Sequence, residues 1–287
     1  MTRVILSLMM LLSLVSCAAE SRLSAAVALG LLGDDGGDKL FYYPTKDSNY
    51  TPKHHRYAYQ DVYFQSADGL KLHGWWMPAN GAAKATVVYS HGNAGSMGHH
   101  LVFVDWLIDA GYNVLMYDYR GYGLSEGEVS KEGLVLDAGA AFSYVASRDG
   151  VDDIVAVGHS MGGAKSIAAL SLAAPELLKA VIVDSTFSSY RDMAERVAGK
   201  AARKVVSDTY NPCDRVGDLP KGVPLMVVHG AADSTIPFSQ AEKLYAAANH
   251  PKTLMEIAGG NHVNCFFIKE GKYRRELLQW MDQVLQD

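Results

Sequence analysis

The sequence has no surplus of positive charge. It contains 26 Lys and Arg against 31 Asp and Glu, and its formal net charge is -5. A nucleic-acid-binding surface needs clustered cations to neutralise phosphates, so we expect no nucleic acid among its partners. Internal repeats and low-complexity tracts are also lacking. With 287 residues, 49% of them hydrophobic, the chain is long enough for one catalytic domain around a substantial core.

No apolar run near the N-terminus is long enough to span a bilayer comfortably. The run Val4–Val15 follows the short basic start Met1–Arg3 and closes at Leu14–Cys17, as in a signal peptide. The closing tetrapeptide resembles the lipobox of bacterial lipoproteins. The resemblance implies removal of residues 1–16, a lipid anchor at Cys17, and a location in the bacterial envelope on a periplasm-facing membrane. An ordinary secretory peptide, or an apolar helix with an incidental cysteine, is the alternative.

Cysteine is scarce, with three in the chain. If Cys17 carries lipid, Cys213 and Cys265 remain in an oxidising compartment. A disulfide between them and two separate thiols are both open, because the sequence does not give their separation. Neither follows a strand and precedes a helix, so we do not expect a cysteine nucleophile.

From residue 57 onward the pattern alternates between strand and helix. Tyr57–Gln65 and Leu70–Met77 flank an Asp-Gly turn and alternate in polarity, which predicts an antiparallel hairpin. Repeated βα units follow, and these require a parallel sheet covered by helices on both faces. We expect strands at Ala85–Ser90, Asn113–Tyr117, Ile154–Gly158, Ala180–Val183, Pro224–His229 and Thr253–Ile257, and helices at Gly98–Ala110, Lys131–Ser147, after Ser160, Phe238–Ala248 and Lys269–Leu285.

The expected domain organisation has three parts. Residues 1–16 form the signal peptide, residues 17–56 a tether and N-terminal extension, and residues 57–287 the catalytic domain. Within that domain, residues 187–222 interrupt the βα rhythm. Apolar residues recur there at helical spacing, which indicates an amphipathic helix; they are Tyr190, Met193, Val197, Ala201 and Val205. A small cap over the site and a surface helix packed on the sheet are both consistent with this pattern.

The most informative stretch is the G-x-S-x-G motif Gly158–Gly162. A β-branched, apolar strand precedes it, and a run with helical spacing follows Gly163. A tight strand-to-helix turn of this kind pushes the serine hydroxyl clear of the sheet and leaves room only for glycine beside it. We therefore predict that Ser160 is a nucleophile. The Met161 N–H, at the positive end of the following helix, would be an oxyanion donor.

A serine nucleophile needs a base within hydrogen-bond reach and an acid that orients the base. Asp233 follows the strand that ends near His229, and His262 follows the last strand, after Gly259–Gly260. Ser, Asp, His is the chain order of the triad in folds with this nucleophile turn. We predict that His262 is the base and Asp233 the acid. Asp184 also ends a strand and is the rival acid.

The second oxyanion donor is expected in the loop His91–Gly95, which directly follows a predicted strand. Gly92 frees the backbone there, so the Asn93 N–H could join the Met161 N–H. A phosphate-binding loop is the rival interpretation, but the lysine and Ser/Thr of that motif are absent.

Taken together, the motifs at His91–Gly95, Tyr117–Gly123 and Gly158–Gly163 and the segments around Asp233 and His262 resemble the α/β-hydrolase superfamily. The closest resemblance is to the Bem46-like and ABHD-type serine hydrolases, over roughly residues 58–285. It implies an α/β fold with an eight-stranded, mostly parallel sheet, helices on both faces and a small helical cap. It also implies acyl hydrolysis without a metal or organic cofactor. Val263-Asn264-Cys265 departs from the Asn-Asp found after the histidine in many relatives.

These observations predict a serine hydrolase that cleaves carboxylic esters or thioesters of small acylated, lipid-like substrates through an acyl-enzyme at Ser160. A serine peptidase or aminopeptidase of the same fold is the alternative, although no acidic subsite for a peptide amine is identifiable. A non-catalytic scaffold with this fold is the other alternative, and the intact set of Ser160, Asp233 and His262 argues against it. The sequence identifies no protein partner.

Overall fold

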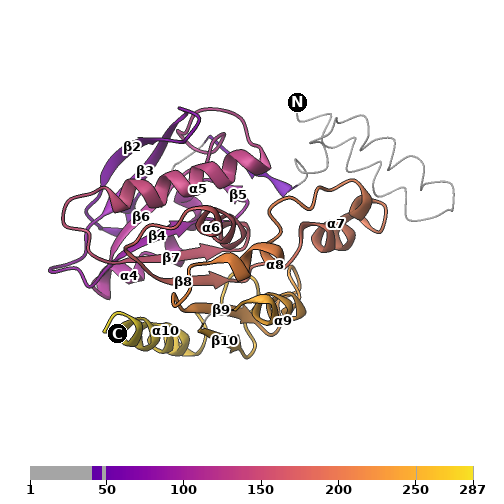
Figure 1. The fold of residues 1–287 in the computed structure, drawn as a ribbon. Helices are drawn as coiled ribbons and strands as arrows, with labels where there is room; N and C mark the ends of the chain where they lie inside the picture. The colour runs from indigo at the N-terminus through magenta and orange to yellow at the C-terminus, as the bar shows by residue number, and fades with distance from the viewer. Residues whose placement is uncertain (1–40, 47–49, 250, 287) are drawn as a thin grey trace.

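The computed structural model describes residues 41–46, 50–249 and 251–286, and its centre is an eight-stranded sheet (Figure 1). The strand order is β10-β9-β8-β7-β4-β6-β3-β2. Strand β3 runs antiparallel to both β2 and β6, and the remaining pairs are parallel. The predicted hairpin and the mostly parallel sheet are thus confirmed. The strands are β2 Gln60–Gln65, β3 Lys71–Met77, β4 Thr86–Ser90, β6 Asn113–Tyr117, β7 Ile154–His159, β8 Leu178–Asp184, β9 Leu225–Gly230 and β10 Lys252–Ile257.

Helices cover both faces of this sheet. One face carries α5, α6 and α9, and the other carries α3, α4 and α10. The helices are α3 Met97–His100, α4 Trp106–Asp109, α5 Lys131–Ala146, α6 Met161–Leu172, α7 Tyr190–Ala198, α8 Pro212–Arg215, α9 Phe238–Ala247 and α10 Lys272–Val284. Short 3-10 turns lie at η3 Pro52–His55, η4 Leu101–Phe103, η5 Ala202–Lys204, η6 Val216–Asp218 and η7 Lys269–Gly271.

The central strands are buried on both faces, and their side chains divide alternately between two cores. In β7, Ile154 and Ala156 belong to the core under α5 and α6, while Val155 and Val157 belong to the core under α4 and α10. This division follows from the two-residue period of a strand. A strand buried on both faces needs apolar residues at every position, which explains the continuous apolar runs in the sequence.

One predicted helix is broken in the structure. In place of a single helix over residues 98–110, the chain forms α3, the 3-10 turn η4 and α4. The buried residues Met97, Leu101, Val104 and Ile108 recur at spacings of four, three and four, as on one face of an α-helix. The apolar pattern of the sequence therefore gives no sign of the break.

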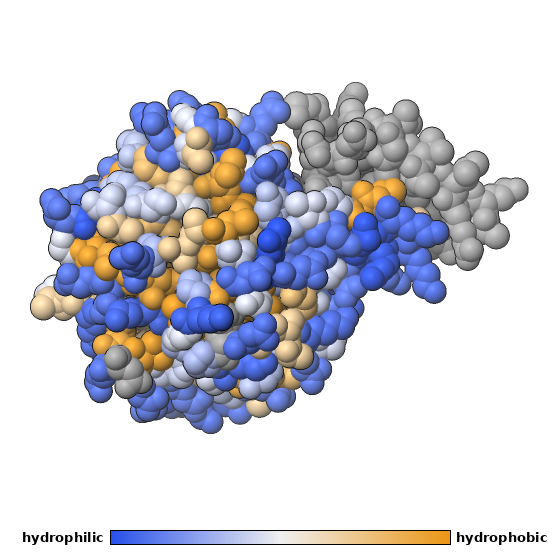
Figure 2. Space-filling model, viewed as in Figure 1, coloured by the Kyte–Doolittle hydropathy of each residue, from blue (hydrophilic) through white to orange (hydrophobic). Residues whose placement is uncertain are grey.

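Helix α7 projects from the body of the molecule, at the carboxyl-end edge of the sheet (Figure 1). Its predicted amphipathic character is confirmed for Tyr190 and Met193, which are buried, but not for Val197, which is 71% exposed. The outer surface of this region is mainly hydrophilic (Figure 2). Its apolar side packs on Phe187 and Ile236 in a third, small hydrophobic cluster, separate from the two cores of the sheet.

The two N-terminal strand residues Tyr43–Pro44 (β1) pair with Ala94–Gly95 (β5), in the loop that follows β4. The extension that precedes the main domain is thereby attached to the oxyanion loop. Residues 1–17, where the signal peptide and the lipid-bearing Cys17 are predicted, lie outside the described residues. Within the described ranges, no helix combines the length and apolar character needed to cross a membrane.

Candidate active site

Ser160 lies at the sharp turn between β7 and α6. Its φ is 54° and its ψ is -117°, a strained backbone conformation for a residue with a side chain. A Cβ at Gly162 would be 1.9 Å from the Ser90 oxygen, and a Cβ at Gly158 would be 2.5 Å from the Gly163 Cα. The glycines of the motif are therefore required by close contact between backbone segments. This geometry is the predicted nucleophile turn.

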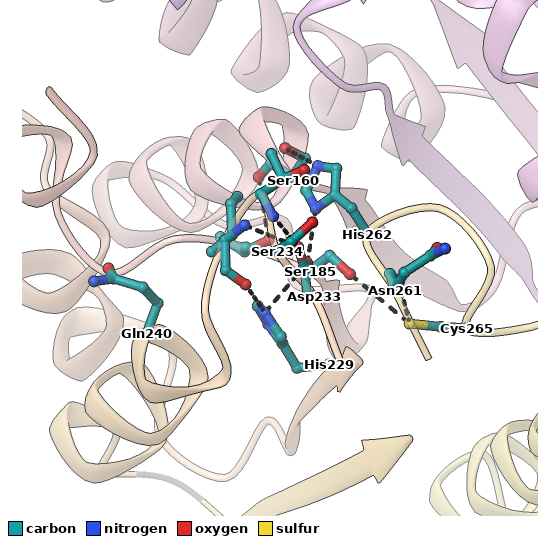
Figure 3. A network of polar contacts seen from close by, with 12 residues as sticks. Ser160, Ser185, His229, Asp233, Ser234, Gln240, Asn261, His262 and Cys265 are labelled. Carbon is teal, nitrogen blue, oxygen red and sulfur yellow. Dashed lines mark hydrogen bonds and ion pairs between the residues drawn. The ribbon is translucent and has the colours of Figure 1, made fainter. Parts of the chain in front are cut away.

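His262 lies between Ser160 and Asp233, as Figure 3 shows. Its Nε2 is 3.2 Å from the Ser160 Oγ, and its Nδ1 is 2.8 Å from the Asp233 Oδ2. A carboxylate can only accept here, so the Nδ1–H donates to Asp233 and the Nε2 accepts from the serine hydroxyl. The structure therefore brings together the three residues predicted from three separate strand ends.

Asp233 is held in a buried position behind the histidine. Its side chain is 0% exposed, and its Oδ1 accepts hydrogen bonds of 2.8 Å from the N–H groups of Thr235 and Ile236. Burial alone would raise the pKa of Asp233, but the hydrogen bonds from His262 and Ile236 outweigh it and lower this pKa below its ordinary value. Asp233 is therefore ionised at neutral pH and can stabilise a protonated imidazole.

The rival acid, Asp184, has a different partner. Its Oδ2 is 3.1 Å from the His159 Nδ1, and its Oδ1 accepts from the Ser185 hydroxyl at 3.0 Å. The His159 ring in turn lies 5.2 Å from the His262 ring, centroid to centroid. His159 and Asp184 thus form a second, buried pair beside the first. The acid in contact with His262 is Asp233.

The two predicted oxyanion donors both face the same cavity as Ser160. Met161 is the first residue of α6, so its N–H has no acceptor within the helix. The Asn93 oxygen accepts from the Tyr43 N–H at 3.0 Å, and the Asn93 Nδ2 donates to the Phe41 oxygen at 3.0 Å. Among the described residues, the Asn93 N–H has no hydrogen-bond acceptor. It is available for an oxyanion.

Buried histidines support the oxyanion loop from behind. The His91 Nδ1 is 2.7 Å from the Gly92 oxygen, and the His100 Nε2 is 2.8 Å from the Ala94 oxygen. Their rings stack at 5.1 Å, and burial lowers the pKa of His100 well below its usual range. A neutral His100 can therefore donate to the loop without placing a charge behind it. His100 belongs to none of the motifs in the sequence, so its role becomes visible only in the structure.

Two charged residues of the Tyr117–Gly123 motif, Asp118 and Arg120, have structural partners. The Arg120 guanidinium binds Asp137 at 2.7 Å and Asp68 at 2.7 Å, and it joins the strand end to α5 and to the hairpin turn. Asp118 accepts from the Met97 N–H at 2.7 Å, and its Oδ1 lies 3.4 Å from the His91 Nε2. Both residues therefore shape loops beside the site.

Of the two possibilities that the sequence left open for Cys213 and Cys265, the structure has two separate free thiols. Cys213 packs against the core under α6 and α9, whereas Cys265 belongs to the core under α10, so the sheet lies between them. The Cys265 Sγ donates to the Asn261 oxygen at 3.3 Å, directly before His262 (Figure 3). Burial raises the pKa of both thiols, and they are therefore poor nucleophiles.

A cavity of about 220 Å³ opens at Ser160. One part of its lining comes from the triad residues Ser160 and His262 and from the oxyanion donors. The other part is mainly apolar or aromatic. The lining residues are Phe41, Tyr43, Asn93, Ser160, Met161, Phe187, Tyr190, Met193, Ala194, Val197, Ala198, Ala202, Thr235, Ile236 and His262. No group of three or more His, Cys, Asp and Glu side chains suited to a metal ion is found in the described part of the chain.

The sheet order and the contacts of Ser160, His262 and Asp233 define an α/β-hydrolase. Comparison with known proteins is consistent with this class. Residues 81–213 match a family described as "Serine aminopeptidase, S33". On the evidence of its relatives, the chain belongs to the Bem46-like α/β-hydrolases.

Three relatives extend over most of the chain. The protein YfhR of Escherichia coli strain K12, described as uncharacterised, is 36% identical over 252 residues, covering 86% of each chain. The α/β-hydrolase domain-containing protein WAV2 of Arabidopsis thaliana is 30% identical over 272 residues, covering 86% of this chain and 87% of its own. The protein bem46 of Schizosaccharomyces pombe is 29% identical over 210 residues, covering 70% of each chain.

Two solved esterase structures share the fold. The esterase Pf2001 of Pyrococcus furiosus aligns with a TM-score of 0.68 at 22% identity, covering 86% of this chain and 97% of its own. Est1E of Butyrivibrio proteoclasticus, solved with ferulic acid, aligns with a TM-score of 0.64 at 20% identity, covering 79% of this chain and 100% of its own. At these identities the likeness is one of fold.

Proposed function

We propose that the protein is a serine hydrolase that cleaves carboxylic esters or thioesters of acylated, lipid-like substrates through an acyl-enzyme at Ser160. The observation that carries the proposal is the position of His262, within hydrogen-bond distance of both Ser160 and Asp233. Nucleophile, base and orienting acid are already in contact before any substrate binds.

In the acylation step, the His262 Nε2 takes the Ser160 hydroxyl proton while the Oγ bonds to the substrate carbonyl carbon. The carbonyl oxygen becomes an oxyanion, and the N–H groups of Asn93 and Met161 donate to it. Asp233 stabilises the imidazolium through the Nδ1–H. The tetrahedral species then collapses, the bond to the alcohol or thiol breaks, and His262 gives the leaving group its proton.

In the deacylation step, a water molecule replaces the leaving group. His262 takes a proton from this water while the water oxygen bonds to the acyl carbon. The acyl bond to the Ser160 Oγ then breaks, and His262 returns the proton to the serine. The carboxylic acid leaves, and the same two oxyanion donors serve both steps.

The lining of the cavity supports an ester or thioester over a peptide with a free amine. The matching family is described as a serine aminopeptidase, so this second function requires a test. An aminopeptidase needs an anionic group to bind the substrate ammonium. Among the described residues that line the cavity there is no Asp or Glu, and His262 is the sole titratable group besides two tyrosines.

Labelling with a fluorescent fluorophosphonate tests the nucleophile directly. We expect the wild-type chain to be labelled and Ser160→Ala to show no label. Ser185→Ala is the matched control, because Ser185 is a buried neighbour whose hydroxyl contacts Asp184 and not His262. Retained label in Ser160→Ala, with label lost in Ser185→Ala, would contradict the assignment. Absence of label in a folded wild-type chain would favour the non-catalytic scaffold.

A panel of substrates separates the two enzymatic functions. Hydrolysis of p-nitrophenyl esters and acyl thioesters is compared with that of aminoacyl p-nitroanilides at matched concentrations. We expect kcat/KM for the best ester to exceed that for the best anilide by at least about 10²-fold, because the cavity offers the ammonium no countercharge. A preference for anilides with a free amine would establish the aminopeptidase instead.

For the N-terminal segment we propose signal peptidase cleavage after Ser16, lipid attachment to Cys17 and residence on a periplasm-facing membrane. The basic start, the short apolar run and the Leu14–Cys17 tetrapeptide support this location. The described catalytic domain would then be tethered to the membrane by the chain that precedes Phe41.

A further inference from the structure

We propose that the cavity between Phe41 and α7 is an acyl-chain subsite that accepts an unbranched, uncharged chain of about six to nine carbons. This inference rests on the function proposed above and goes beyond it, because it specifies the acyl group. Its starting point is the division of the cavity lining into two groups. Ser160, Met161, Asn93 and His262 form the reactive group, and the remaining lining is mainly apolar.

The apolar part of the lining comes from three segments. Phe41 and Tyr43 contribute from the N-terminal extension, Ile236 from the loop after Asp233, and the segment from Phe187 through α7 to η5 contributes the rest. Most of the buried members of this lining form the third hydrophobic cluster, apart from the two cores of the sheet. A cluster that surrounds an empty volume beside a nucleophile is suited to an apolar part of a substrate. An acyl chain attached to Ser160 would have direct access to it.

The size of the cavity limits the length of the chain. An apolar protein cavity of roughly 150 Å³ holds benzene, so each carbon needs about 25 Å³. The cavity at Ser160 measures about 220 Å³. It can therefore enclose about nine carbons at that density. A palmitoyl chain, with sixteen carbons, would have to leave much of its length outside.

The wall formed by α7 is held in place through Tyr190. The Lys131 and Lys165 ammonium groups lie 4.2 and 5.2 Å from the centre of its ring. The rings of Phe41 and Phe187 meet it edge-on, at 5.7 and 4.8 Å. Cation–π contacts of buried lysines are among the stronger ones because the cations are partly desolvated. A wall supported from four directions gives the cavity a defined volume and the enzyme a defined chain-length limit.

The other end of α7 is tied to the loop that carries the catalytic acid. The Arg196 guanidinium donates to the Thr235 oxygen at 3.0 Å and also to the Ser234 oxygen. Both acceptors lie within two residues of Asp233.

Ala194 and Ala202, which are buried in the lining, are the small residues at which added volume would shorten the cavity.

The experiment compares kcat/KM for p-nitrophenyl acetate, butyrate, hexanoate, octanoate, dodecanoate and palmitate. For the wild-type chain we expect a rise of about fourfold per methylene up to about octanoate, followed by a decline. Ala202→Phe should lower octanoate turnover at least tenfold while acetate turnover stays within about threefold. Met193→Ala enlarges the cavity and should move the optimum towards dodecanoate.

Two controls keep the result unambiguous. Ala246→Phe adds the same side chain at an exposed position of α9 outside the cavity lining, and it should leave the profile unchanged. If Ala202→Phe does not fold, Ala198→Phe replaces it, because Ala198 lines the cavity from an exposed position. Turnover that keeps rising to palmitate, or a profile unaffected by the cavity variants, would overturn the subsite. Fluorophosphonate labelling of Ser160 is measured in parallel, so failure of the subsite is distinguished from failure of the hydrolase itself.

Discussion

Ser160 combines a strained backbone with two fixed hydrogen bonds. A residue with a side chain in this region of φ and ψ costs of order 1–3 kcal/mol. Its N–H donates to the Asp184 oxygen at 2.8 Å, and its carbonyl accepts from the Thr186 hydroxyl at 3.1 Å. The partners are the last residue of the neighbouring strand β8 and a residue just after it. The side chain that reacts is therefore oriented by backbone groups that do not take part in the reaction.

Asp233→Asn should reduce kcat/KM for an ester by about 10³- to 10⁴-fold. An amide can leave the imidazole in the wrong tautomer and cannot stabilise its cation. Asp184→Asn is the matched control, since Asp184 contacts His159 in the same way and is also buried. Its kcat/KM should stay within about tenfold of wild type. Steady-state kinetics of the two variants decides between the two acids. A larger loss of kcat/KM in Asp184→Asn than in Asp233→Asn would make Asp184 the acid of the triad.

The lowered pKa of Asp233 predicts the pH dependence of stability. A carboxyl with a lower pKa in the folded state stabilises the fold above its unfolded pKa of about 3.9, and this contribution is lost as the pH falls through the folded value. The stability advantage of wild type over Asp233→Asn should therefore be largest near neutral pH and shrink below about pH 4. Urea unfolding of both chains at several pH values measures this difference in unfolding free energy.

Asp218→Asn serves as the control for that titration. The Asp218 side chain is 60% exposed and lies 3.9 Å from the Arg215 guanidinium, so its replacement should change the unfolding free energy at neutral pH by no more than about 1 kcal/mol. An advantage of wild type over Asp233→Asn that stays constant down to pH 3 would contradict the lowered pKa.

The turn between β7 and α6 depends on contacts between backbone segments. Gly162→Ala would place a methyl group 1.9 Å from the Ser90 oxygen, so we expect a loss of at least about 3 kcal/mol of unfolding free energy. Gly139→Ala, within α5, meets nothing within 4 Å and should stabilise the chain by about 0.5–1 kcal/mol. Chemical denaturation measures both changes. Equal stability of the two variants would show that the turn can relax.

The oxyanion loop depends on an element outside the βα units. Strand β1 pairs with β5, the Tyr43 N–H donates to Asn93, and the Asn93 side chain donates to Phe41. These contacts occupy the side-chain amide and the carbonyl of Asn93, while its N–H has no acceptor among the described residues. The N-terminal extension is thereby part of the site as well as part of the tether.

The proposed lipid anchor determines where the whole molecule works. Cys17→Ser should remove the lipid, so the chain should move from the detergent phase to the aqueous phase in a Triton X-114 partition. Intact mass measures the loss of the lipid. Cys213→Ser is the control, since this thiol is half-buried on α8 of the catalytic domain and its loss should leave partitioning unchanged. An unmodified mass for the wild-type N-terminus would contradict lipidation.

The sequence by itself determined the order of most strands and helices, the nucleophile turn and the choice of Ser160 and His262 as nucleophile and base. These features depend on local patterns, such as an apolar run followed by glycine or a polar residue just after a strand. The sequence also indicated Asn93 as an oxyanion donor, since the loop after β4 lies at the same edge of the sheet as Ser160. The pattern could not decide between Asp233 and Asp184, because both end strands.

Only the tertiary structure decided between the remaining alternatives, since they depend on distances across the sheet. It placed Cys213 and Cys265 on opposite faces and so excluded their disulfide. It divided the segment of residues 98–110 into α3, η4 and α4, although the buried residues there keep the spacing of one continuous helix. It brought Phe41 and Tyr190 to the same cavity from positions about half the chain apart. Side chains that line a cavity carry no local signal, since their contacts form only when distant segments pack together.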